Sequence, residues 1–318
     1  MKKYFTLAMV VLFMSSLLVN AQEAEEQPEE QPEKPWKVGG DVSLTFGQTA
    51  LVNWSSGGVS SFSLNGLFNY HADYKKDKVI WTNNLIMAYG MYKEKDDKRK
   101  KNDDKIDFIS NLGYEMVKNW YYSLTLGFKS QFDKGYPEEQ DTLYTSNWFA
   151  PAYTTLGIGF TYQPNENLQL ILTPATYRFT VVNNQRLADA GEYGVDPAEY
   201  EMLADSTYIK TKDGSKIRHE LGFNLKFMYK VTIMKNVGFQ TNLELFSNYL
   251  KEPQNIDVYW DNYFTFTINK WLTANLTTSL IYDHDINITD KDGNRGPRTQ
   301  FKQTFGLGLA YKFGHQSE

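Results

Sequence analysis

The chain has 318 residues, a formal net charge of −5 and no cysteine. The lack of cysteine excludes disulfides, thiol chemistry and a lipoprotein attachment site in this sequence. Basic and acidic residues are mixed without a basic stripe, which argues against a nucleic-acid-binding protein. Aromatic residues make up 15% of the chain, an unusually high share for a soluble globular protein.

The N-terminal segment, residues 1–21, has the features of a secretory signal peptide. Lys2-Lys3 form its positive region, Tyr4–Val19 is mostly apolar, and cleavage is expected after Ala21. Residues 22–35 follow as a low-complexity linker with six glutamates and one lysine. Such a segment buries too little apolar surface to fold. We therefore expect an exported protein with a disordered acidic linker before its folded part.

From residue 36 to residue 314 the sequence is a series of segments in which apolar and polar residues alternate. A period of two marks strands whose two faces meet different environments. Twelve such segments are expected, at residues 36–47, 60–74, 78–93, 105–117, 120–133, 150–162, 167–182, 215–233, 237–250, 256–269, 271–284 and 300–313. Each is long enough to cross a bilayer as a tilted strand, which takes about 9–11 residues.

The connections between these segments alternate in length. The short ones are residues 75–77, 118–119, 163–166, 234–236 and 270, and the longer ones are 48–59, 94–104, 134–149, 183–214, 251–255 and 285–299. Short turns on one side and longer loops on the other are typical of outer-membrane barrels. We therefore predict an all-β fold, a transmembrane antiparallel up-and-down β-barrel of about 12 strands (range 10–14). Both termini would be periplasmic, and residues 315–318 would form a C-terminal tail.

The polar face of the predicted strands carries charged residues. Those expected to face inward are Lys129, Arg218, Glu220, Lys226, Lys230, Glu244 and Lys302. A soluble β-sandwich, the competing architecture, would bury one face of each strand in an apolar core. Seven charges in such a core would be prohibitive, because unpaired buried charges are very costly. We therefore predict a narrow polar lumen, in which charges of mixed sign can pair across the barrel.

The first long loop contains a distinctive block. The stretch Phe46–Leu64 reads FGQTALVNWSSGGVSSFSL. The order of Gln48, Asn53-Trp54-Ser55 and Gly57-Gly58, followed by a serine-rich strand start, resembles domain-of-unknown-function family 3078, a family of outer-membrane barrels from Bacteroidota. The resemblance extends over most of the chain from residue 36, but its specific part is this block. It implies an outer-membrane location and a barrel fold, and it implies no reaction.

The apolar residues of this block also have a physical interpretation. Leu51, Val52, Asn53 and Trp54 are expected to fold inward as a plug near the mouth of the lumen. Gly57-Gly58 would allow the sharp return of the chain into the next strand. A loop that is exposed and binds a partner is the alternative.

The longest loop, residues 183–214, carries signals for ordered elements. Asp196-Pro197-Ala198-Glu199 combines an N-cap acid, a first-turn proline and a third-position glutamate, which predict a short helix from Pro197 to about Ala204. Ser206–Lys212, the turn Asp213-Gly214 and Ser215–Leu221 predict a hairpin arm. We expect these elements to form an ordered cap over the mouth of the barrel.

Catalytic and metal-site patterns are missing from the sequence. The four histidines share no metal-ligand spacing, and no nucleophile motif of the G-x-S-x-G type is present. We therefore expect no enzymatic activity, no cofactor and no metal. Two Asp-Ser/Thr-aliphatic-or-Thr sequences in predicted surface loops mark Thr142 and Ser206 as candidate O-glycan sites. A hairpin turn is expected at Asp292-Gly293.

Two functions stay open at this point. A porin-like barrel with a narrow polar lumen would allow limited passage of a small solute. An accessory barrel would instead bind a partner complex through its outer wall and the 183–214 loop, and it would not conduct. The expected partners are outer-membrane lipid and lipopolysaccharide, with the barrel-assembly machinery acting during insertion. A stable protein partner is left open, and no nucleic acid is expected.

Overall fold

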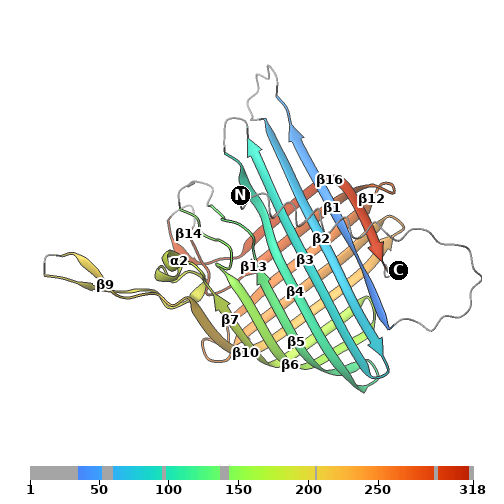
Figure 1. Cartoon of the computed structure of the whole chain (residues 1–318), viewed down its shortest axis with the longest axis horizontal. Coiled ribbons are helices and arrows are strands. Elements are labelled where there is room, and N and C mark those ends of the chain that lie inside the picture. The colour runs from blue at the N-terminus through green and yellow to red at the C-terminus, as the bar shows by residue number, and fades with distance from the viewer. Residues whose placement is uncertain are drawn as a thin grey trace, which may run out of the picture. The chain divides into compact units, whose positions relative to one another are not determined.

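The computed structural model describes residues 35–51, 60–94, 98–136, 143–204, 206–289 and 293–314. Within these residues twelve antiparallel strands form one closed barrel (Figure 1). The barrel strands are β1 (Trp36–Thr49), β2 (Ser61–Lys76), β3 (Val79–Glu94), β4 (Lys100–Val117), β5 (Trp120–Ser130), β6 (Ala152–Asn165), β7 (Leu168–Val181), β10 (Ile217–Met234), β11 (Val237–Asn248), β12 (Ile256–Thr267), β13 (Leu272–Tyr282) and β16 (Gln300–Gly314). The predicted all-β barrel is therefore confirmed. The predicted signal peptide, residues 22–34 of the linker and the tail 315–318 lie outside the described residues.

The barrel closes between its first and last strands. β1 pairs with β16 from Gly39–Gly314 to Phe46–Leu307, so the sheet has no open edge. The seam requires close backbone approach, because a Cβ atom on Gly308 would lie 2.1 Å from the carbonyl oxygen of Leu44. The pairing also places the start of β1 and the end of β16 at the same end of the barrel. None of the helices in the described residues has the length and hydropathy of a membrane-spanning helix.

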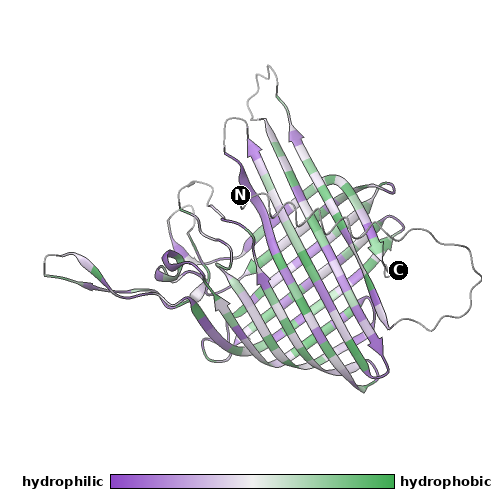
Figure 2. Cartoon of the chain, in the orientation of Figure 1, coloured by the Kyte–Doolittle hydropathy of each residue, from purple (hydrophilic) through white to green (hydrophobic). Residues whose placement is uncertain are grey.

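The outer wall of the barrel is apolar, and hydropathy alternates along the strands (Figure 2). Large exposed apolar side chains on this wall include Leu44, Phe46, Leu124, Leu126, Ile158, Phe305, Leu307 and Leu309. Aromatic rings gather towards both ends of the strands. Trp36 lies 5.2 Å from Tyr74 at one end, and Trp148 lies 5.0 Å from Phe149 at the other, measured between ring centroids. An apolar band flanked by aromatic rings is the outer surface of a barrel that spans a membrane.

The connections also differ between the two ends of the barrel. β2–β3, β4–β5, β6–β7, β10–β11 and β12–β13 are joined by short turns. We call this end the short-turn end and the opposite end the long-loop end. Asp77 and Asn119 take positive φ values of 53° and 67° in two of the short turns. Both residue types tolerate the left-handed conformation, which allows so tight a reversal.

The prediction for the 183–214 loop was partly wrong. The helix lies earlier, at α2 (Gln185–Asp189), where the Asn184 side chain caps it by accepting from the Leu187 N–H. A 3-10 turn follows at η1 (Glu192–Gly194). The expected helix from Pro197 to Ala204 is replaced by β8 (Glu199–Met202), which pairs with β9 (Tyr208–Lys212).

The hairpin arm was therefore predicted with the wrong partner strand, because residues 217–221 belong to β10. An isolated helix of this length would be marginal in water. Pairing with β9 supplies the backbone hydrogen bonds of residues 199–202 instead. The rest of the loop packs as a cap around a small apolar cluster of Ala150, Val182, Leu187, Ala188 and Val195.

A second small hairpin lies in the last long loop. β14 (Asn287–Thr289) pairs with β15 (Arg295–Pro297). Gly293 takes a positive φ of 84° between them, as a turn at this position requires. Asp292, the other residue of the predicted turn, is outside the described residues.

Candidate functional site: the charged lumen

Charged side chains at inward positions of the strands meet across the lumen. Lys105 Nζ on β4 lies 2.5 Å from Asp261 Oδ2 on β12. Five strands separate β4 from β12 on either side of the ring, so this pair joins opposite walls. Ser279 donates a hydrogen bond of 2.6 Å to the other oxygen of Asp261, which fixes the carboxylate in place.

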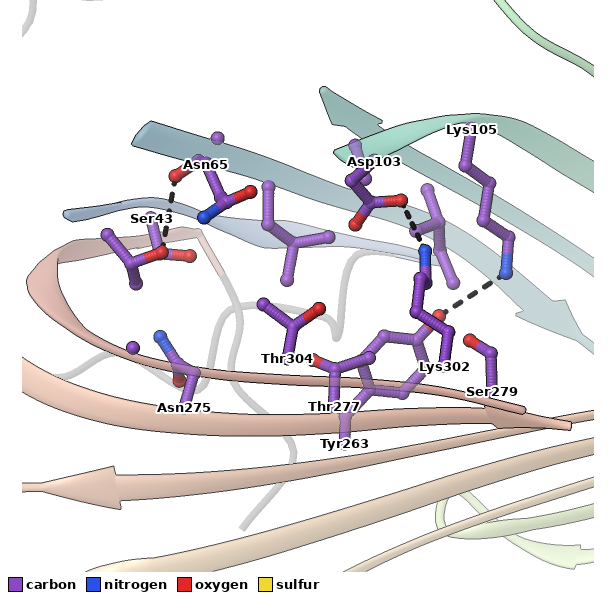
Figure 3. Close-up of a pocket in the computed structure, with 16 residues that line it drawn as sticks. Ser43, Asn65, Asp103, Lys105, Tyr263, Asn275, Thr277, Ser279, Lys302 and Thr304 are labelled. Carbon is purple, nitrogen blue, oxygen red and sulfur yellow. Dashed lines mark hydrogen bonds and ion pairs between the residues drawn. The ribbon is translucent and has the colours of Figure 1, made fainter. Parts of the chain in front are cut away.

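Two further pairs cross the lumen beside the first. Lys302 on β16 lies 2.6 Å from Asp103 on β4 (Figure 3). Lys129 on β5 forms an ion pair with Glu244 on β11. We call these three pairs the charge belt: Lys105–Asp261, Lys302–Asp103 and Lys129–Glu244. The belt joins β4 and β5 on one side of the lumen to β11, β12 and β16 on the other.

Glu244 has more side-chain partners than any other carboxylate of the belt. Its Oε1 atom accepts a hydrogen bond of 2.7 Å from Asn224 Nδ2 and lies 3.4 Å from Lys226 Nζ. Lys129 Nζ also sits 4.6 Å from the centroid of the Tyr259 ring. A carboxylate whose side chain is 13% exposed needs such partners, because a buried unpaired charge is costly.

A second network lies on the inner wall, towards the long-loop end. Arg178 on β7 binds Glu220 on β10 through two hydrogen bonds of 2.7 Å. The same guanidinium lies 2.9 Å from Asp257 on β12 and 3.8 Å from the centroid of the Phe246 ring. Bidentate pairing holds both side chains in a fixed geometry. We call this set, together with Arg218, the arginine network.

Arg218 links the arginine network to the loops at the barrel mouth. Its Nη2 lies 3.0 Å from Glu220 Oε1, and its Nη1 lies 2.6 Å from Asp285 Oδ2. Asp285 belongs to the loop between β13 and β16, and that loop also meets the cap, where Arg295 lies 2.8 Å from Glu192 of η1. Two loops at the long-loop end, β7–β10 and β13–β16, are therefore joined to each other.

Between these charged groups the lumen keeps small polar hollows. Half of the residues that line the hollow in Figure 3 carry hydroxyl or amide groups, and the belt residues Asp103, Lys105 and Lys302 lie on one side. Its uncharged polar lining comprises Ser43, Thr45, Asn65, Tyr263, Asn275, Thr277, Ser279 and Thr304. A second hollow lies on the other flank, where Asp107, Lys129 and Glu244 are part of its wall. Such linings suit water and small polar solutes.

Six of the seven charges singled out from the sequence belong to these networks or contact a member of them. They are Lys129, Arg218, Glu220, Lys226, Glu244 and Lys302. Lys230 lies apart from both networks, on β10 near the short-turn end, where its backbone N–H donates to the Asn167 carbonyl. The signal that identified these residues was strand parity, the alternation of successive side chains between the two faces of a strand.

Sequence reasoning missed other members of the two networks, namely Asp103, Lys105, Arg178, Asp257 and Asp261. Parity could have found Lys105, Arg178, Asp257 and Asp261, because each lies on the polar face of an expected strand. Asp103 could not be found in this way, because the expected strand began at residue 105. The pairing across the lumen depends on how the ring closes, which parity does not give.

The remaining candidate residues are only partly described. Leu51 donates its N–H to Ser60 Oγ at 2.9 Å, whereas Val52, Asn53 and Trp54 of the expected plug lie outside the described residues. Thr142 also lies outside them. Ser206 is exposed between β8 and β9. Among the residues that are described, no group of three potential ligands is placed to hold a metal.

Comparison with known proteins gives a family match and distant structural likenesses. Residues 46–136 match the family described as protein of unknown function (DUF3078). No curated protein sequence is a significant match.

Solved structures with a similar arrangement include three barrels. The translocator domain of autotransporter NalP from Neisseria meningitidis is 10% identical, with 89% of this chain and 90% of that one covered and a TM-score of 0.33. The COG4313 outer membrane channel from Pseudomonas putida F1 is 10% identical, with 92% and 100% covered and a TM-score of 0.38. The NanC porin is 6% identical, with 86% and 100% covered and a TM-score of 0.34. Because these values are low, the barrel assignment is based on the strand pairing of this chain.

Proposed function

We propose that this protein is a bacterial outer-membrane barrel whose lumen is held closed by paired charges, so that it passes small polar solutes at most. The charge belt carries this proposal. The apolar outer wall, the aromatic rings at both ends and the unequal connections support the membrane location. The family resemblance favours a source among the Bacteroidota.

The belt acts as a barrier because its charges are satisfied by one another. Asp261 and Glu244 each have a lysine partner from across the lumen. A solute that crosses at this level has to separate at least one pair, and breaking a partly buried pair leaves an uncompensated charge at a cost of several kcal/mol. A barrel of twelve strands has a narrow interior, so there is little room to bypass the belt.

Single-channel conductance in planar bilayers tests this function. The wild-type protein should show no steps, or small and rare ones. A variant that removes two belt pairs, Lys105→Ala/Asp261→Ala with Lys129→Ala/Glu244→Ala, should conduct in larger and longer steps. The matched control is Glu199→Ala/Lys212→Ala, which removes an exposed pair on the β8–β9 hairpin and should leave conductance unchanged. A wild-type protein with the steady conductance of an open porin would refute the closed lumen.

A second candidate function, that of an accessory barrel, is favoured by the β8–β9 hairpin. The hairpin projects from the barrel as an arm (Figure 1), and all nine residues of its strands are exposed. Tyr200, Met202 and Tyr208 are 56%, 60% and 68% exposed, and the register places them on one face. Exposed apolar patches of this kind often mark interaction sites.

Co-purification from native outer membrane tests the accessory function. A partner recovered with the wild-type protein should be lost with Tyr200→Ser/Met202→Ser/Tyr208→Ser. The control Glu199→Gln/Lys212→Gln changes the same arm but keeps the three apolar side chains, and it should retain the partner. Recovery of the same proteins with the wild type and with both variants would contradict a role for the arm.

Further expectations from the sequence remain proposals. We propose that the signal peptide is cleaved after Ala21, that the barrel-assembly machinery inserts the chain, and that the long-loop end meets lipopolysaccharide. We propose no catalytic activity and no cofactor. Thr142 and Ser206 are proposed O-glycan sites, and Ser206 would place a glycan on the arm. Mass spectrometry of the mature protein would test both the cleavage site and the two modifications.

A further inference from the structure

The short-turn end of the barrel carries a ring of exposed lysines. They lie in or beside four of the five short turns: Lys75, Lys76, Lys78, Lys118, Lys235 and Lys270. We call these six residues the lysine collar. None of them has an ion-pair partner within the part of the chain that the structure describes, in contrast to the lysines of the lumen. Among the described residues, the collar therefore presents positive charge that no ion pair neutralises around one end of the barrel.

Among the described residues, fewer acidic side chains than lysines lie at the turns of this end. Within the four turns that carry the collar, all of them described, the one acid is Asp77, between Lys76 and Lys78. Glu115 lies beside the β2–β3 turn, where its backbone N–H donates to the Lys78 carbonyl at 2.7 Å. The fifth turn contains Glu166, but its carboxylate lies 2.5 Å from Lys37 Nζ on β1. At the long-loop end, by comparison, several basic residues are paired within the protein, such as Lys101 with Asp104 at 2.7 Å and Lys210 with Asp189 at 2.9 Å.

Aromatic side chains place the collar at a defined depth. Trp271 follows Lys270 directly and is 64% exposed. The rings of Trp36 and Trp81 lie 5.6 Å apart beside the β2–β3 turn. Exposed tryptophan and tyrosine side chains of membrane proteins sit at the level of the lipid headgroups. Lysines in the turns just beyond them can extend their ammonium groups to the same level.

We propose that the lysine collar binds the phosphate groups of anionic phospholipids in the leaflet at the short-turn end. This inference rests on the proposed function as a membrane-spanning barrel. A lysine near an anionic membrane surface strengthens association about fivefold, and salt weakens the effect because the collar is exposed. A lipid shell enriched in anionic headgroups would fix the depth of the barrel and help to orient it.

Electron paramagnetic resonance with spin-labelled lipids tests the proposal. The mature chain is reconstituted in phosphatidylcholine vesicles that contain trace spin-labelled phosphatidylglycerol or phosphatidylcholine. Lipids in contact with the barrel give a motionally restricted signal. The restricted fraction should be several-fold larger for the phosphatidylglycerol label, and salt should reduce the difference. The collar variant Lys76→Gln/Lys118→Gln/Lys235→Gln/Lys270→Gln should lose the preference.

The control variant removes four positive charges from the other end, through Lys98→Gln/Arg99→Gln/Lys134→Gln/Lys251→Gln, and it should keep the preference. An equal loss in both variants would overturn the collar, because net charge alone would then explain the selectivity.

No preference in the wild-type protein would also overturn it, and displacement of the lipid by soluble polyglutamate would assign the collar to an acidic polypeptide instead. A restricted signal with no headgroup preference would refute the collar and leave the membrane barrel standing. The absence of any restricted signal would refute the barrel itself.

Discussion

Glu220→Gln should destabilise the barrel more than any change to an exposed charge. The Glu220 side chain is 1% exposed and accepts from Arg178 through both oxygens. Its Oε1 atom also meets Arg218 at 3.0 Å and Asn248 at 3.2 Å. The amide keeps the shape of the side chain but removes its negative charge. The largely buried guanidinium groups of Arg178 and Arg218 then lose their shared carboxylate partner. Loss of one partner from a buried ion pair costs about 3–5 kcal/mol.

Urea unfolding in detergent micelles, followed by tryptophan fluorescence, measures this free energy. The control is Glu199→Gln, whose partner Lys212 is largely exposed, and it should cost less than about 1 kcal/mol. The double variant Arg178→Gln/Glu220→Gln should cost less than the sum of its single changes, because the two residues share one interaction. A Glu220→Gln protein that unfolds within about 1 kcal/mol of wild type would show that the arginine network is already solvated.

Three further predictions follow from the arrangement of the faces and of the cap. Phe227 lies on the outer face of β10, and Phe227→Arg should cost about 2–4 kcal/mol if it lies near mid-membrane. Lys226→Leu on the inner face should be far milder in the same unfolding assay, and equal penalties would mean that the faces are reversed. Single cysteines at Lys98 and Asp213 should be labelled from outside intact cells, whereas cysteines at Lys76 and Asn236 should not, and the opposite pattern would invert the topology. The pKa of Asp189 is lowered to about 2, because Gln185, Lys210 and the Gly214 N–H donate hydrogen bonds to its carboxylate. A pKa lower in the folded than in the unfolded protein stabilises the root of the arm above about pH 4, and this contribution is lost as the pH falls towards 2. Pepsin cleavage of the arm should therefore rise over this range in the wild-type protein relative to Asp189→Asn, and parallel cleavage of the two proteins would contradict the prediction.

The barrel could be predicted from sequence because its signal is repeated in every strand. Lipid on one side and a polar lumen on the other force apolar and polar residues to alternate along each strand. The expected segment 215–233 matched β10 to within two residues at its start and one residue at its end. Strand ends that face the loops were less certain, as β4 shows by starting at Lys100 rather than at residue 105. At those ends the environment changes gradually, so the pattern carries less information.

The cap was harder to predict because its elements depend on contacts with distant residues. Asp196-Pro197 carries a helix-start signal, yet the Asp196 carbonyl accepts from the Ser215 N–H and the following residues pair with β9. The α2 helix, which was not predicted, buries Leu187 and Ala188 against Ala150 and Val182 from other parts of the chain. Local signals identify what a segment can form, and tertiary packing selects among these options.

The closure that we propose for the lumen depends on strand number more than on the number of charges. Inward charges of both signs are common to wide and narrow barrels, and in a wide barrel they face water. In this barrel, side chains of ordinary length from opposite walls meet, as Lys105 and Asp261 do at 2.5 Å. In the closed lumen that we propose, each paired charge replaces water with a protein partner, which narrows the hydrated path and cancels much of the field that would draw an ion through. On this proposal, twelve strands with lysines and acids at matching levels turn a polar lumen into a barrier, and reopening it requires the loss of the pairs rather than a wider ring.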